Sequence, residues 1–108
     1  MNFDPDRIYT EVVSSGEAWA DAKSAYEALS DMTKTILADI VTDFLPNCSS
    51  KSEAETRGLA SKQYKEHLAS VAAARRAWLL AEVRWKGIVL LADLRRSEES
   101  SRRAEMRL

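Results

Sequence analysis

The chain contains very little of the material from which turns, disulfides and β-sheets are built. Its 108 residues include three glycines, two prolines and one cysteine. So few turn-forming residues disfavour a fold of many short strands. One cysteine excludes an internal disulfide framework and suits a reducing cytoplasm. We therefore expect an all-α, cytoplasmic protein.

Long apolar runs are also missing. The first six residues include two aspartates and no basic residue, and they lack both the basic start and the apolar run of a secretory signal. The most apolar stretch, residues 77–92, is interrupted by Glu82, Arg84 and Lys86. Charges at that density exclude a membrane span, so we expect no membrane association.

Residues that carry catalysis or bind metals do not form a known motif. Cys48 has no second cysteine and no neighbouring histidine that would activate it. His67 is preceded three residues earlier by Tyr64, not by the glutamate of di-metal helical bundles, so we expect it at the surface or beside a helix seam. The sequence predicts a non-enzymatic protein with no cofactor and no metal.

The chain does contain two pairs of aromatic residues at heptad spacing, one pair on each side of a predicted helix break. Trp19 and Tyr26 lie seven residues apart, as do Trp78 and Trp85, and the segment around Pro46 separates the two pairs. Seven residues return a side chain to nearly the same helix face, so each pair marks a seam that meets another helix. This spacing predicts a long antiparallel helical hairpin that resembles a coiled coil.

Capping signals set the expected helix ends. Asp4 followed by Pro5 is typical of a helix start, and Pro46 disfavours helical geometry at the residue before it. The second helix is expected to start near Ser50 or Ser52, and residues 52–55 offer a capping box. We predict a single domain over residues 1–108, with one helix over about residues 4–45, a turn at 46–51 and a second helix over about 52–105.

The predicted seam alternates steps of three and four residues along both helices. Its expected contact residues are Val12, Trp19, Tyr26, Leu29, Tyr64, Val71, Trp78 and Trp85. A tight hairpin at this turn, in which facing residue numbers sum to about 97, places Trp19 against Trp78 and Tyr26 against Val71. Aromatic residues at this spacing indicate a packed core or a subunit interface and not a ligand site.

The charges divide between the two halves of the chain. Residues 1–46 carry nine acidic and three basic side chains, whereas residues 47–108 carry eight acidic and thirteen basic ones. The same register brings Asp21 near Arg76 and Glu11 near Lys86. We therefore predict ion pairs between the two helices.

A second apolar stripe on the second helix is not explained by a two-helix hairpin. It lies on a different face from the seam and consists of Leu80, Val83, Gly87, Leu91 and Leu94. Two helices touch along one line, and folds this small need further partners to cover apolar surface. We predict that these residues form a homo-oligomer interface, giving a four-helix bundle as a dimer. A different protein partner is the alternative.

The basic second half raises the possibility of nucleic-acid binding. Its arginines are interspersed with acids such as Glu82, Glu98 and Glu99, and no helix-turn-helix spacing accompanies them. A solvated or internally paired face is the favoured interpretation, and DNA binding stays the less favoured one.

The segment 74–78, Ala-Arg-Arg-Ala-Trp, and the ending at 95–107 resemble the C-terminal part of small helical accessory proteins of bacteriophages and prophages. The resemblance covers about a third of the chain and implies a phage or prophage origin, hence the cytoplasm of a bacterial host. Our interpretation is an interaction or adaptor module that acts as an oligomeric helical bundle. The alternatives are an inhibitor of a host defence or nucleic-acid-processing complex, and an accessory DNA-binding protein of phage replication or recombination.

Overall fold

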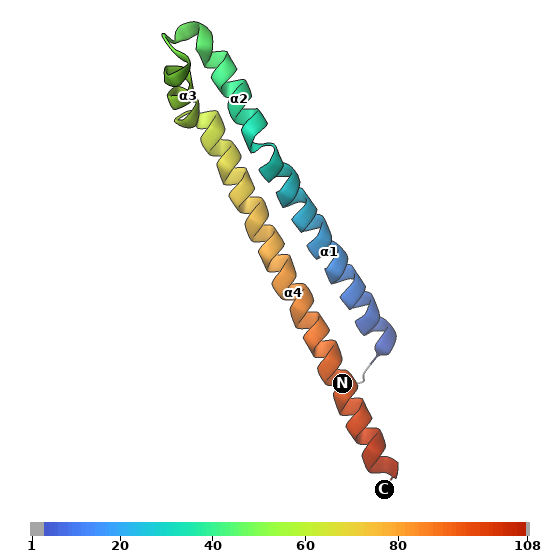
Figure 1. Cartoon of the computed structure of the whole chain (residues 1–108). Coiled ribbons are helices and arrows are strands. Elements are labelled where there is room, and N and C mark those ends of the chain that lie inside the picture. Colours follow the sequence, from blue (N-terminus) through green and yellow to red (C-terminus); the bar gives the residue numbers. More distant parts are fainter. Residues whose placement is uncertain (1–3, 108) are drawn as a thin grey trace.

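A computed structural model describes residues 4–107 as a long hairpin of α-helices (Figure 1). Helix α1 spans Pro5–Asp31 and α2 spans Thr33–Phe44. The 3-10 turn η1 at Leu45–Asn47 then leads to α3, which spans Lys51–Leu59. The last helix, α4, spans Lys62–Arg107. The Cα trace extends 86 × 18 × 17 Å. Helix α1 packs antiparallel along α4, which continues beyond the start of α1 (Figure 1). The predicted all-α helical hairpin is confirmed.

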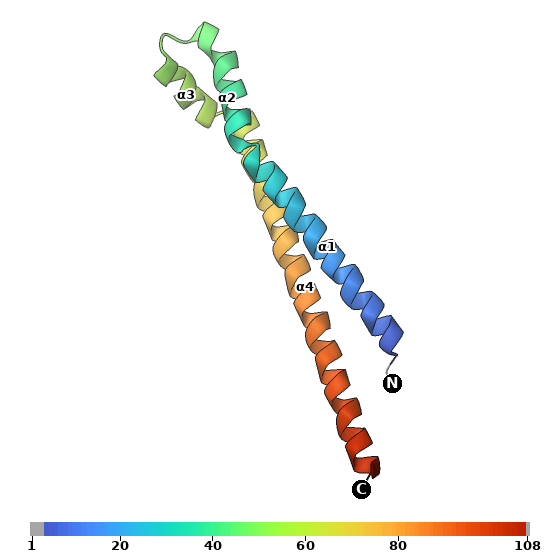
Figure 2. The ribbon, with the colours of Figure 1, turned by 45° about the vertical axis from the view of Figure 1, so that its right-hand side comes forward.

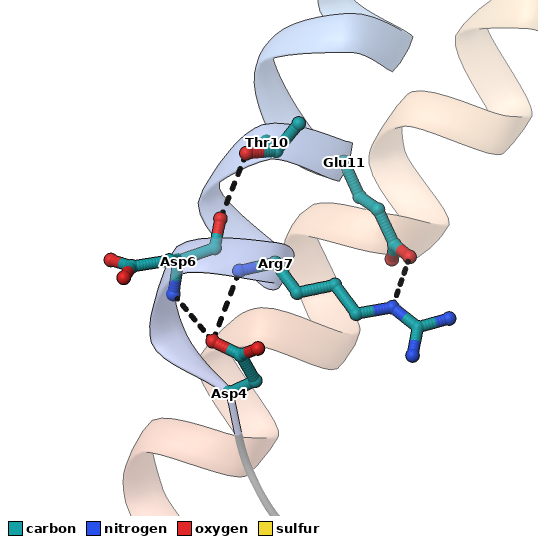
Figure 3. Close-up of polar contacts among 5 residues, drawn as sticks. All are labelled: Asp4, Asp6, Arg7, Thr10 and Glu11. Carbon is teal, nitrogen blue, oxygen red and sulfur yellow. Dashed lines mark hydrogen bonds and ion pairs between the residues drawn. The ribbon is translucent and has the colours of Figure 1, made fainter.

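Helix α1 begins at the predicted cap (Figure 3). One Asp4 carboxylate oxygen accepts hydrogen bonds from the backbone N–H groups of Asp6, at 3.1 Å, and Arg7, at 3.3 Å. These groups have no partner inside the helix, so the carboxylate satisfies two of its free donors. One turn later, Arg7 forms an ion pair with Glu11 at 3.4 Å. All these contacts are local and fix where α1 starts.

The prediction of one unbroken helix over residues 4–45 was wrong, because Met32 separates α1 from α2. The Met32 N–H donates to the carbonyl of Leu29 at 3.3 Å, and the carbonyl of Met32 accepts from Ile36 at 2.9 Å. Next to this break, the Thr33 hydroxyl and Nε2 of His67 share a hydrogen bond of 2.9 Å that joins α2 to α4. His67 is buried, so its expected position at the surface or beside the seam was also wrong.

The prediction of one helix over residues 52–105 was wrong as well, because the chain breaks again at Ala60 and Ser61. The Ser61 hydroxyl donates to the carbonyl of Gly58 at 2.7 Å and accepts from the N–H of Tyr64 at 3.2 Å. One side chain thus closes α3 and caps α4. Helix α3 lies beside the end of α2 and not in line with α4 (Figure 2). The chain therefore reverses through a corner that includes a short helix.

The start of α3 is held by a cap at Ser50, the earlier of the two predicted starting positions and two residues before the predicted box at Ser52. The Ser50 hydroxyl accepts from the N–H of Glu53 at 3.1 Å, and the Glu53 carboxylate accepts from the N–H and hydroxyl of Ser49 at 2.8 and 2.7 Å. The hydrogen bonds from Ser49 lower the pKa of the Glu53 carboxyl below its ordinary value, and Arg57 adds to this effect. The ionised carboxylate is therefore part of the corner.

The corner between α2 and α3 contains much of the well-buried interior. Ile40 and Val41 of α2 and Ala54 and Gly58 of α3 are all buried. A Cβ built on Gly58 would lie 2.9 Å from a methyl carbon of Val41. The two helices approach closely enough that this position has no space for a side chain.

Substitution of Gly58 by alanine is therefore expected to destabilise the protein. Overpacking costs about 1–3 kcal/mol, which exceeds the gain of roughly 1 kcal/mol in helix propensity. Urea unfolding of Gly58→Ala, Val41→Ala and the double variant measures the coupling between the two sites. Because Val41→Ala removes the obstructing methyls, Gly58→Ala should be tolerated better in that background. An equal cost in both backgrounds would contradict the close approach.

The lowered pKa of Glu53 predicts a pH-dependent contribution to stability. An acid whose pKa is lowered by folding stabilises the folded state above its unfolded pKa, and this contribution disappears as the pH falls through the folded pKa. We expect Glu53→Gln to lower Tm at neutral pH and to have a smaller effect at acid pH, where the wild-type carboxyl is protonated too. Thermal unfolding followed by circular dichroism at both pH values checks this, and equal losses of Tm would count against it.

Candidate protein interaction surface

Helix α4 has two apolar faces, and the hairpin covers one of them. The covered face, here called the inner seam, alternates steps of three and four residues, and all its members are buried or partly buried: Tyr64, His67, Val71, Ala74, Trp78, Ala81, Trp85, Ile88, Ala92, Arg95 and Glu99. The eight residues predicted for the helix–helix seam are all partly buried: Val12, Trp19, Tyr26, Leu29, Tyr64, Val71, Trp78 and Trp85.

Two aromatic stacks join α1 to α4. The rings of Trp19 and Trp85 stack at 4.9 Å with an interplanar angle of 22°, and those of Tyr26 and Trp78 stack at 5.3 Å and 16°. The predicted pairs, Trp19 with Trp78 and Tyr26 with Val71, were wrong, because each partner lies seven residues further along α4. A seam that repeats every seven residues keeps its pattern when one helix slides by one repeat.

The predicted ion pairs between the helices are not formed. Within residues 4–107, every ion pair joins residues of one helix that are three or four positions apart, such as Lys86 with Glu82 at 3.3 Å. Asp21 and Glu11 form no ion pair with α4. Such exposed local pairs contribute little to stability, so aromatic packing and not ion pairing holds α1 against α4.

Trp85 explains a glycine inside α1. A Cβ built on Gly16 would lie 3.1 Å from Nε1 of Trp85, so the indole lies against the backbone of α1 next to its stack on Trp19. Nε1 of Trp19 and of Trp78 is buried and has no hydrogen-bond partner among residues 4–107. Packing and stacking hold these indoles in place.

The five residues predicted for an oligomer interface are all exposed. Val83 is 70% exposed, Leu94 54% and Leu80 53%; Leu91 and Gly87 are exposed too. The prediction omitted Leu90, which is 60% exposed. A strict alternation of steps of three and four residues would have included Leu90. This alternation defines the surface that we call the outer stripe, which consists of Leu80, Val83, Gly87, Leu90 and Leu94. Leu91 flanks this stripe.

The outer stripe points away from α1. Each of its members lies two positions after an inner-seam residue, as Leu80 follows Trp78 and Gly87 follows Trp85. Two residues rotate the direction of a side chain by about 200° around an α-helix. The two apolar faces of α4 are therefore on nearly opposite sides of the helix.

Within residues 4–107, the structure contains neither a metal-binding cluster nor a helix that could span a membrane. No three histidine, cysteine, aspartate or glutamate side chains in this range come close enough to hold a metal ion. One depression lies where the start of α1 meets α4, and a shallower one on α4 is lined by Trp85, Lys86, Val89, Leu90 and Asp93. Over the same residues, no helix combines the length and the apolarity that a bilayer crossing requires.

No protein-family model matches this chain, and no curated protein or solved structure matches it either.

The aromatic stacks predict that alanine substitutions at positions 85 and 83 of α4 differ greatly in their effect on the free energy of unfolding. Trp85→Ala removes a ring that packs on both Trp19 and Gly16, and is expected to cost about 3–5 kcal/mol. Val83→Ala, on the opposite face, should cost less than about 0.5 kcal/mol in the isolated chain, since Val83 is exposed. Urea unfolding at low protein concentration measures both values. Similar costs for the two variants would contradict the assignment of inner and outer faces.

Proposed function

We propose that this chain is a non-enzymatic protein–protein interaction or adaptor module that acts as an oligomeric helical bundle. The observation that carries the proposal is the outer stripe, in which Leu80, Val83, Leu90 and Leu94 are each more than half exposed along one face of α4. A contiguous apolar surface of this kind is typical of an interaction site. Its spacing of three and four residues is the pattern that a partner helix fits.

The small interior of the hairpin supports self-association. Among residues 4–107, the buried apolar side chains are Ile40, Val41, Ala54 and Ala92. Three of these lie at the corner, so the long α1–α4 portion depends on partly buried residues. Small domains bury a low fraction of their surface and gain stability from a partner. Burial of the outer stripe would supply that gain along α4.

The proposal includes a phage or prophage origin and a location in the cytoplasm of a bacterial host, supported by the resemblance of residues 74–78 and 95–107 to phage accessory proteins. Direct binding to DNA is less favoured. Lys86, Arg95 and Arg103 already pair with neighbouring glutamates of α4, which reduces the charge available to phosphates.

Sedimentation equilibrium tests the proposed self-association. We expect the wild-type chain to form dimers at micromolar concentration, and Leu90→Lys to shift it towards the monomer, because the substitution places a charge in the centre of the outer stripe. The control is Met106→Lys, which alters an exposed apolar residue of α4 outside the stripe and should leave the dimer unchanged. Circular dichroism should show the same helix content in all three proteins. A wild-type chain that is strictly monomeric would refute the oligomeric module.

A further inference from the structure

We propose that the outer stripe binds a second copy of this chain, with the two α4 helices packed antiparallel so that Gly87 faces the partner's Leu90. This inference rests on the proposed function, and it specifies the occupant of the surface, its direction and its register. Three features of α4 support it: the order of large and small residues, the placement of charges beside the stripe, and a glycine that the hairpin does not require.

Within residues 4–107, no part of the hairpin packs against Gly87. A Cβ built on Gly87 would have no atom within 4 Å, whereas a Cβ on Gly16 would press on Trp85 and one on Gly58 would press on Val41. Glycine weakens the interior of a helix, so at Gly16 and Gly58 close packing explains its presence. The close approach of a second helix at Gly87 supplies the same explanation there.

The antiparallel register pairs large residues with smaller ones. When Gly87 lies against the partner's Leu90, Val83 lies against the partner's Leu94 and Leu80 against the partner's Ser97. The symmetry of the pair repeats each contact, so both copies of Leu90 fill the space above a glycine. Residues 80–97 span about 26 Å of helix. All four large residues of the outer stripe are covered within that length.

Charges beside the stripe are self-complementary in this register. Lys86 and Asp93 lie on the same flank of the outer stripe, and the shallow depression containing Leu90 extends from one to the other. Antiparallel packing brings Lys86 beside the partner's Asp93, and symmetry forms this pair twice. Asp93 takes part in no ion pair within residues 4–107, and Lys86 is 69% exposed while bound to Glu82.

Parallel packing would provide neither the pairing of large with small residues nor the pairing of opposite charges. Identical residues face each other in a parallel pair, so Gly87 would face the partner's Gly87 and leave a gap between the helices. The flanking positions would also bring Asp93 beside the partner's Glu98, and two like-charged contacts would result. Steric and electrostatic patterns thus favour the same direction.

The assembly that follows is a flat row of helices. Since the inner seam and outer stripe lie on nearly opposite sides of α4, the two α4 helices form the centre and the two α1 helices form the outer edges. This differs from the closed four-helix bundle expected from the sequence, in which each helix packs against two neighbours around a common core.

Cross-linking through introduced cysteines tests the direction and the register in the full chain. In a Cys48→Ser background, Leu80→Cys and Ser97→Cys are prepared separately. One portion of each variant is treated alone with a short thiol-specific cross-linker, and untreated portions are mixed and then treated. We expect covalent dimers from the mixture and none from either variant alone, because the antiparallel pair places 80 beside 97 and separates the two copies of 80. Sedimentation equilibrium of the untreated proteins verifies that both still associate.

Each other outcome overturns the inference in a recognisable way. Covalent dimers from each variant alone would mean parallel packing, and the proposed interaction module would survive. Dimers by sedimentation without any cross-link would assign the contact to another surface or register. Monomers at every concentration, in the variants and in the wild type, would refute the inference together with the proposed oligomeric module.

A charge exchange tests the same register without cysteines. Asp93→Lys places two lysines beside each other at both symmetric sites and is expected to weaken the dimer roughly three- to tenfold. Adding Lys86→Asp to that variant restores opposite charges and should recover most of the affinity. If the double variant associates no better than Asp93→Lys, Lys86 and Asp93 do not meet across the dimer.

Discussion

The stacking of aromatic rings between α1 and α4 is the interaction on which the rest of the hairpin depends. Trp85 on Trp19 and Trp78 on Tyr26 are the large contacts along the straight portion of the molecule. No ion pair between helices assists them within residues 4–107. Aromatic pairs contribute about 0.5–1.5 kcal/mol beyond the burial of their area. The stacks therefore determine which residues of α4 face α1, and consequently which residues face outward.

The hairpin and its seams could be predicted from the sequence, but the register could not. The aromatic heptads at Trp19 and Trp78 and the break at Pro46 are strong local signals, and they led to the correct class and the correct faces. A repeat of seven residues is degenerate, however, because Trp19 can meet Trp78 or Trp85 equally well. The choice depends on how many residues the corner uses. The corner includes the separate helix α3 and the break at Ala60 and Ser61, and no periodic pattern predicts these features. The agreement of charges with the predicted register was coincidental.

The candidate surface was more predictable than the details of packing. Exposure of Leu80, Val83 and Leu94 follows from the position of these residues relative to the inner seam, and an error of register along the helix axis does not change the face on which a residue lies. Gly16 and Gly58 show the opposite case. Their role depends on the neighbours Trp85 and Val41, which become apparent once the helices are placed in space. The sequence alone marks such glycines as weaknesses of a helix.

The positions of the three tryptophans make them intrinsic fluorescence probes of the hairpin. All of them belong to the contact between α1 and α4, and the indole nitrogens of Trp19 and Trp78 are shielded from solvent with no polar partner in the described part of the chain. An indole in such surroundings emits at shorter wavelength than one in water. Separation of the two helices would expose these rings and move the emission to the red, whereas changes confined to the corner would leave the spectrum unaltered. Intrinsic fluorescence thus reports on the opening of the long arms independently of the short helix that connects them.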